Sequence, residues 1–270
     1  MNGRPDVLGL IAGCGPLPLI VAREAKDRGL RVVAVALREE TDPALEELAD
    51  RTVWVRLGQL SALLRAFRRE GVAEAIMAGK VHMTHLFSRI RPDLRGARLF
   101  ARLRDRSGDA IMEGVAEELA KEGITLRRCT DFLQSVLLGP GVLTRRAPTE
   151  AERDDIRFGQ EIARMIAALR IGQTVVVKQG TVVAVESIEG TDAAIRRGGA
   201  LGKDGVVVVK ASRPDHDFRF DVPVIGRGTV EVLQEVRGRA LAVEAGRTLC
   251  LEREEMVALA DEVGITIVAE

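Results

Sequence analysis

Strand-like and helix-like segments alternate through the first half of the chain. Short aliphatic runs typical of buried strands occupy residues 7–12, 31–37, 52–57 and 73–79. Helical patterns occupy residues 16–29, 60–71 and 108–123, and each ends at a glycine. Because parallel strands need long crossover connections between them, this alternation predicts an α/β domain with a Rossmann-like parallel sheet.

The pattern changes after about Asp131. Residues 137–155 hold Gly, Pro, Gly and Pro in a short span, which is typical of a connection between domains. At 270 residues the chain is long enough for two domains of ordinary size. We therefore expect two α/β domains joined by a Pro/Gly linker. Their bounds are 1–135 for the N-terminal domain, 136–150 for the linker and 151–270 for the C-terminal domain.

The second half also contains helix and strand patterns. Thr149 and Glu152 form a capping-box pattern at the start of a helix over 149–170. Residues 174–187 read as a β-hairpin that turns at Gln179-Gly180. Further elements are predicted as strands at 205–211, 239–246 and 265–269 and a helix at 252–263.

Composition excludes several classes of protein. Lys and Arg number 40, as do Asp and Glu, so the chain has no overall positive charge to attract nucleic acid. The three cysteines are far apart in the sequence, which argues against a disulfide framework or a zinc cluster. No apolar run reaches the length of a membrane span. These features favour a cytoplasmic protein without a nucleic-acid partner.

The first predicted strand ends in a glycine-rich turn. Gly13 and Gly15 precede a helix that opens with Pro16, and Gly79-Lys80 follow the fourth strand. Glycines at such a turn let the backbone approach a phosphate, and a lysine at that edge of a parallel sheet can neutralise it. A tight turn without a ligand and a solvated lysine are the alternatives. The third glycine of a dinucleotide fingerprint is missing, which disfavours a redox dinucleotide enzyme.

Acids, glycines and a lysine recur at predicted strand ends in the second half. Glu189, Gly190, Thr191 and Asp192 lie between the hairpin and a short helix. Two carboxylates beside a Gly-Thr turn could hold Mg²⁺ or Mn²⁺ and an anion, whereas Thr191 or Asp192 could instead only cap the helix. Three more positions of this kind follow, at Lys210, Asp221 and the Glu244–Gly246 turn. Asp221 in "FDVPVIG" could be a turn residue or a catalytic acid.

Histidines offer little support for a metal centre. His82 and His85 are three residues apart and His216 is distant. Two imidazoles without a nearby carboxylate make a poor zinc site. The sequence also lacks the blocks of the histidine-rich dinuclear phosphoesterases.

Several blocks together resemble the LpxI-type UDP-2,3-diacylglucosamine pyrophosphatases of lipid A biosynthesis. The matching blocks are "LGLIAGCGPLP", "AGKV", "GDAIM", "IGQTVVV", "AVESIEGTDAAIRR", "VVVKASRPDHDFRFDVPVIG" and "AVEAGRTL". They extend from residue 8 to about residue 249. The order of "EGTD" and then "D-x-P-x-I-G" is the most specific of these features.

The resemblance implies a function and a set of site residues. The family hydrolyses the pyrophosphate of UDP-2,3-diacylglucosamine to UMP and 2,3-diacylglucosamine 1-phosphate (lipid X) with a divalent metal. The aspartate of its "D-x-P-x-I-G" block is the catalytic acid, which here is Asp221. We expect Asp221, Asp192 and Glu189 to bind the metal. Substrate would contact the remaining predicted site residues, which are Gly13, Gly15, Gly79, Lys80, Gly190, Thr191, Lys210 and Gly246.

Partners and location follow from that substrate. A substrate with two acyl chains implies weak peripheral association with the inner face of the cytoplasmic membrane. A homodimer is expected only because symmetric dimers are the commonest soluble assembly. The alternative function is a non-catalytic nucleotide- or lipid-binding regulator on the same scaffold.

Overall fold

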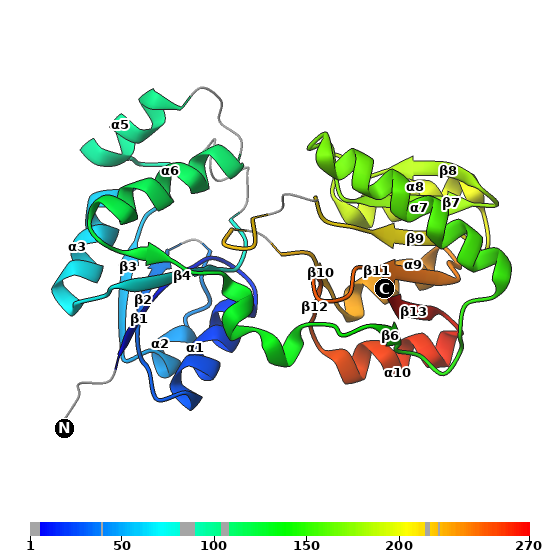
Figure 1. Cartoon of the computed structure of the whole chain (residues 1–270), viewed down its shortest axis with the longest axis horizontal. Coiled ribbons are helices and arrows are strands. Elements are labelled where there is room, and N and C mark those ends of the chain that lie inside the picture. Colours follow the sequence, from blue (N-terminus) through cyan, green and yellow to red (C-terminus); the bar gives the residue numbers. More distant parts are fainter. Residues whose placement is uncertain (1–5, 39, 82–89, 104–107, 214–216, 221) are drawn as a thin grey trace. The chain divides into compact units, whose positions relative to one another are not determined.

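The computed structural model describes residues 6–38, 40–81, 90–103, 108–213, 217–220 and 222–270. The chain divides into two compact units. Unit 1 runs to Gln134 and also takes in Phe218–Phe220, while unit 2 is built from Ser135–Asp217 and the chain after residue 220. Figure 1 shows the elements of both units along the chain.

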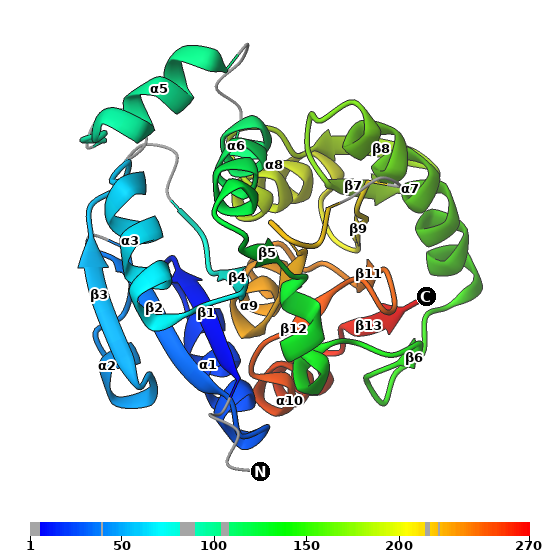
Figure 2. The ribbon, with the colours of Figure 1, turned by 60° about the vertical axis from the view of Figure 1, so that its left-hand side comes forward.

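Unit 1 contains a five-stranded sheet in the order β3-β2-β1-β4-β5 (Figure 2). Its strands are β1 (Val7–Ala12), β2 (Arg31–Leu37), β3 (Arg51–Val55), β4 (Glu74–Ala78) and β5 (Thr125–Leu126). Every neighbouring pair is parallel. The predicted Rossmann-like parallel sheet is therefore confirmed. β1 and β2 have the predicted bounds, the ends of β3 and β4 differ from the predicted ones by one or two residues, and β5 was not predicted.

Helices of unit 1 connect these strands. They are α1 (Leu17–Asp27), α2 (Leu45–Leu48), α3 (Leu60–Glu70), α5 (Leu94–Arg102) and α6 (Gly108–Lys121), with a 3₁₀ turn η1 (Cys129–Phe132). Packing of α3 on the sheet is close. A Cβ on Gly9 of β1 would lie 2.7 Å from Val72 Cγ1 and 2.9 Å from Phe67 Cζ. Glycine in the central strand thus makes room for the fully buried Phe67 ring of α3.

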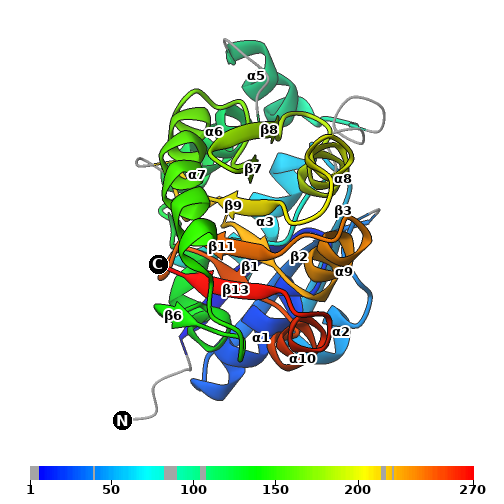
Figure 3. The same cartoon turned by 90° about the vertical axis from the view of Figure 1, so that its right-hand side faces the viewer.

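Unit 2 contains a six-stranded mixed sheet in the order β6-β13-β11-β9-β7-β8 (Figure 3). Its strands are β6 (Gly141–Val142), β7 (Thr174–Lys178), β8 (Thr181–Val185), β9 (Val207–Lys210), β11 (Ala240–Val243) and β13 (Thr266–Ala269). β9, β11 and β13 run parallel, whereas β6 and the β7–β8 hairpin pair antiparallel. A separate parallel pair joins β10 (Val224–Ile225) to β12 (Leu249–Cys250).

Helices cover both faces of the second sheet. They are α7 (Glu150–Ala168), α8 (Thr191–Gly202), α9 (Arg227–Glu235) and α10 (Arg253–Val263). In Figure 3, α7 lies on one face and α8, α9 and α10 lie on the other. Alternate valines of one strand supply the two cores, since Val175 and Val177 pack with α7 residues while Val176 packs with Ile195 of α8. This explains why these strands read as continuous apolar runs in the sequence.

Two local predictions in unit 2 are confirmed. The Thr149 side chain accepts a hydrogen bond from the Glu152 backbone while the Glu152 carboxylate accepts one from the Thr149 backbone, forming the capping box of α7. The hairpin turns at Gln179 and Gly180, both with positive φ. Asp155 of α7 accepts hydrogen bonds from the backbone N–H groups of both turn residues, at 3.0 and 2.6 Å. That contact was not predicted from the sequence.

Helices α5 and α9 were also not predicted from the sequence.

Among the residues that the structure describes, no helix has the length and apolar content needed to cross a bilayer.

Candidate functional site

The glycine turn after β1 is joined to the end of β4 by backbone hydrogen bonds. Cys14 N–H donates to Lys80 O at 2.7 Å, and Lys80 N–H donates back to Cys14 O at 3.1 Å. Two glycines permit this approach, because a Cβ on Gly13 would overlap Lys80 O and one on Gly79 would lie 2.6 Å from Cys14 O. The structure thus brings together predicted residues Gly13, Gly79 and Lys80. Close packing of the backbone is by itself enough to explain why Gly13 and Gly79 are glycines.

Gly15 differs from these two glycines. Its φ is +86°, it is exposed, and a Cβ there would meet no atom within 4 Å. Helix α1 begins two residues later at Leu17, and Pro16 and Pro18 have no backbone N–H to donate. The donors that remain at this helix N-terminus are the N–H groups of Gly15 and Leu17. A phosphate here would have to approach the Gly15 side of the turn.

Cys14 lies in this turn between the two glycines. Burial raises the pKa of its thiol, and the negative charge of Glu40 adds to that, against smaller opposite effects of backbone hydrogen bonds and of the Lys80 charge. The thiol is therefore the neutral form at physiological pH. Lys80 is exposed at the same edge.

In unit 2 a chain of hydrogen bonds connects the end of β9 with the start of α8. Lys210, the last residue of β9, is only 7% exposed, and its ammonium group donates to the Thr191 hydroxyl at 3.2 Å. The Thr191 hydroxyl donates to Glu186 Oε1 at 2.7 Å. Predicted residues Thr191 and Lys210 therefore lie together. The N-cap residue of α8 is Gly190 and no side chain caps the helix, so the alternative that Thr191 or Asp192 serves as its cap is wrong.

A second polar cluster lies at the end of β11, the strand next to β9. Glu244 is 6% exposed and accepts hydrogen bonds from the Ser212 backbone at 2.7 Å and the Ser212 hydroxyl at 2.6 Å. Arg164 of α7 donates to its other oxygen at 3.1 Å. Burial alone would raise the pKa of Glu244, but these hydrogen bonds and the charge of Arg247 outweigh it and hold the pKa below its ordinary value. Glu244 is therefore an ionised carboxylate that fixes the chain leaving β9.

The predicted metal ligands differ in their surroundings. Glu189 forms an ion pair with Arg197, and a hydrogen bond to its own backbone and that ion pair lower its pKa. Asp192 is exposed in the first turn of α8. Within the described part of the chain, no three His, Cys, Asp or Glu side chains are grouped so as to hold a metal ion.

Two further predicted residues are glycines with positive φ. Gly190 (φ +85°) and Gly246 (φ +69°) both have open space where a Cβ would lie. The Gly246 N–H already donates to Leu138 O at 2.7 Å, so this amide has a partner within unit 2.

Four predicted or considered residues lie outside the described residues. They are Asp221, His82, His85 and His216. In contrast, the structure adds three residues that sequence reasoning missed, namely Glu186, Ser212 and Arg164. Glu186 comes one residue after β8 and Ser212 two residues after β9. A polar residue directly after a strand-like apolar run can be recognised in the sequence. No sequence signal distinguishes Arg164 from other helix arginines.

Comparison with known proteins covers nearly the whole chain. Family models described as "LpxI N-terminal domain" and "LpxI C-terminal domain" match residues 7–136 and 139–268. The chain belongs to the LpxI family. The resemblance inferred from the sequence blocks is thereby confirmed.

One curated member of the LpxI family is similar along nearly all of its length. "UDP-2,3-diacylglucosamine pyrophosphatase LpxI" of Caulobacter vibrioides (strain ATCC 19089 / CIP 103742 / CB 15) is 33% identical over 272 residues, which is 96% of each chain. Solved structures are much less similar. Pyruvate carboxylase from Rhizobium etli has a TM-score of 0.30 and 16% identity over 58% of this chain and 13% of its own. Biotin carboxylase from Campylobacter jejuni has a TM-score of 0.30 and 13% identity over 72% of this chain and 41% of its own.

Proposed function

We propose that this LpxI-family protein hydrolyses the pyrophosphate of UDP-2,3-diacylglucosamine, giving UMP and 2,3-diacylglucosamine 1-phosphate. The observation that carries the proposal is the match to the Caulobacter pyrophosphatase over 96% of both chains. Both halves of the chain match the same family, so neither half is an unrelated addition.

The α8 end of unit 2 supplies groups suited to an anionic pyrophosphate. The half-buried Thr191 hydroxyl and the Lys210 ammonium group adjoin the N-terminus of α8, where backbone N–H groups and the helix dipole favour negative charge. Lys210 is only 7% exposed, so an anionic group that reaches its ammonium group would offset the loss of hydration. We propose that Lys210 and Thr191 bind the phosphoryl oxygens and stabilise charge that develops on them.

Asp221 is proposed as the catalytic acid that orients or activates the attacking water. Glu244 is proposed as a positioning residue. It holds Ser212, two residues beyond Lys210, and thereby fixes the start of the segment that leads to Asp221. In unit 1, we propose that the Gly15 turn and Lys80 contact the uridine nucleotide side.

Metal dependence is part of the proposal. Carboxylate oxygens suit Mg²⁺ or Mn²⁺. Glu189 is already paired with Arg197, whereas Asp192 is exposed next to Thr191 and is open to a metal ion. We propose that Asp192 and Asp221 hold the ion, with Glu189 fixing the turn instead. A bound divalent ion would offset negative charge on the phosphoryl oxygens.

A substrate with two acyl chains further suggests weak peripheral contact with a membrane, in a cytoplasmic setting. A homodimer is also proposed and is tested by light scattering of the purified protein.

The experiment measures UMP release from UDP-2,3-diacylglucosamine by the purified protein with Mg²⁺, with Mn²⁺ and with a chelator. We expect UMP and the acylated sugar 1-phosphate in equal amounts, and loss of turnover with the chelator. Binding of intact substrate without UMP release under all three conditions would favour the non-catalytic regulator. Turnover that is unaffected by the chelator would remove the metal from the proposal and leave the hydrolysis.

A further inference from the structure

Unit 1 has an arginine-rich pocket that the proposed reaction does not use. Its volume is about 260 Å³ and it lies between α3 and α5, next to the end of α6. Four of the lining side chains are arginines and one is a carboxylate. The lining residues are Ser61, Leu64, Arg65, Arg68, Leu94, Arg95, Arg98 and Glu122.

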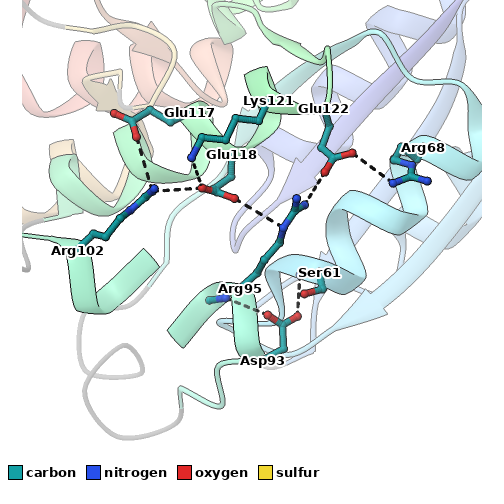
Figure 4. Close-up of polar contacts among 10 residues, drawn as sticks. Ser61, Arg68, Asp93, Arg95, Arg102, Glu117, Glu118, Lys121 and Glu122 are labelled. Carbon is teal, nitrogen blue, oxygen red and sulfur yellow. Dashed lines mark hydrogen bonds and ion pairs between the residues drawn. The ribbon is translucent and has the colours of Figure 1, made fainter. Parts of the chain in front are cut away.

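Close backbone packing brings the two helices together. A Cβ on Gly96 of α5 would overlap the carbonyl oxygen of Gly58, in the turn before α3, so only glycine permits this approach. Asp93 then caps both helices, because its carboxylate accepts from Gly96 N–H at 3.0 Å and from Ser61 N–H at 2.7 Å. Figure 4 shows Asp93 between Ser61 and the start of α5. These contacts hold α3 and α5, which carry most of the lining residues, against one another.

Each helix presents two arginines one turn apart. Arg65 and Arg68 are three residues apart on α3, and Arg95 and Arg98 have the same spacing on α5. Glu122 pairs with Arg95 at 2.6 Å and with Arg68 at 3.4 Å (Figure 4). Among the lining residues, four guanidinium groups face one carboxylate, and Arg95 also pairs with Glu118 at 3.8 Å just outside the lining. Positive charge is therefore in excess at the pocket.

Two of the four arginines lack a carboxylate partner among the described residues. Arg65 and Arg98 are exposed and form no ion pair with any residue that the structure describes, although the protein has as many acids as bases. Some other arginines of this unit are paired, for example Arg31 and Arg51 with Glu70, whereas Arg23 and Arg38 are exposed without an ion pair among the described residues. Arg65 and Arg98 therefore lie beside two arginines that Glu122 holds in place. A ligand with several negative oxygens could bind all four guanidinium groups.

The chemistry and size of the pocket indicate its ligand. Guanidinium groups bind phosphate oxygens with two parallel hydrogen bonds, and several around one pocket favour a phosphate over a single-atom anion. Its volume is slightly below the ~300 Å³ at which pockets for drug-sized molecules begin. Leu64 is buried, whereas Leu94 is 68% exposed. We propose that this pocket binds a phosphate ester group, carried by a phospholipid headgroup or by a small soluble metabolite.

The test uses inorganic phosphate as the probe and the double variant Arg65→Gln/Arg98→Gln. The double variant Arg23→Gln/Arg69→Gln is the matched control, since it removes the same two charges and both residues are exposed but do not line the pocket. The parent and the control should melt at a higher temperature in phosphate than in chloride at the same ionic strength. In the double variant, affinity for phosphate should fall about tenfold or more, because each lost charged hydrogen bond costs about that factor.

A second measurement identifies the source of the phosphate. The same three proteins are sedimented with vesicles of neutral phosphatidylcholine, with and without phosphatidylglycerol. Binding to anionic vesicles that is lost in the double variant but kept in the control assigns the pocket to a lipid headgroup. A phosphate effect on melting without this vesicle difference assigns it to a soluble phosphate ester. If the double variant behaves as the control does in both measurements, the proposal is overturned.

Discussion

The ammonium group of Lys210 donates a hydrogen bond to the hydroxyl oxygen of Thr191 over 3.2 Å. This contact joins the end of β9 to the first turn of α8, and the Thr191 hydroxyl in turn donates to Glu186. A change at Thr191 that keeps the side-chain volume would therefore affect an amine and a buried carboxylate at once.

Thr191→Val removes this hydroxyl and keeps the side-chain shape. We expect kcat/KM for UMP release to fall about 10- to 100-fold, because Lys210 loses a group that orients it and Glu186 loses its hydroxyl donor. Thr181→Val is the matched control, as Thr181 is an exposed threonine at the start of β8. Equal turnover in the two variants would remove Thr191 from the proposed site.

Gly15→Val should abolish the protection that UMP gives against thermal unfolding. A Cβ at this exposed turn would obstruct approach of a phosphate to the backbone. Gly29→Val controls for strain, because Gly29 follows the end of the same helix with a φ of +77° against +86° at Gly15, and both positions have open space. Protection that survives in both variants, or disappears in both, would contradict nucleotide binding at the Gly15 turn.

Asp155→Ala should destabilise unit 2 by about 1–3 kcal/mol, since two N–H groups of the β7–β8 turn would lose their acceptor. The neighbouring Asp154→Ala is expected to change stability by less than about 0.5 kcal/mol, because its ion pair with Arg157 is exposed. Denaturant unfolding of both variants gives the comparison. Similar values for the two would mean that Asp155 does not hold the turn.

Glu244→Gln should show a pH-dependent loss of stability. The folded-state pKa of Glu244 is lowered, so the carboxylate stabilises the protein fully above the unfolded value of about 4.3. That contribution is lost as the pH falls through the folded pKa. The gap in melting temperature between parent and variant should therefore be largest near pH 7 and shrink below about pH 4. A gap that is constant over this range would contradict an ionised Glu244.

Asp221→Asn should lower the rate of UMP release by about 10²–10³-fold or more while binding of intact substrate persists. Asparagine keeps the size and turn-forming capacity of aspartate but removes the charge, so it separates a catalytic acid from a turn residue. Thermal melting and a substrate-binding measurement accompany the assay. Turnover close to that of the parent would assign Asp221 to the turn alone.

The sequence by itself determined the type of each half and several local contacts. Strand and helix periods predicted the parallel sheet of unit 1, since the apolar pattern that marks a buried strand or an amphipathic helix is a local property of the sequence. The α7 capping box and the Gln179-Gly180 turn were also predictable, because each involves residues no more than three positions apart. For the same reason, spacing along the chain was enough to select Gly15 and Thr191 as candidate site residues.

Tertiary structure alone decided which of these residues meet. Glu244 and Ser212 are 32 positions apart, and Asp155 reaches a turn 24 positions away, so strand pairing and helix docking had to place them. The fold also gives Gly13 and Gly79 a role in close backbone packing, which a glycine in the sequence cannot reveal. The arginine pocket is a further case, because α3 and α5 are separated in the chain and meet through the close approach of Gly58 and Gly96. Local interactions are encoded by spacing along the chain, whereas these contacts depend on the path that brings distant segments together.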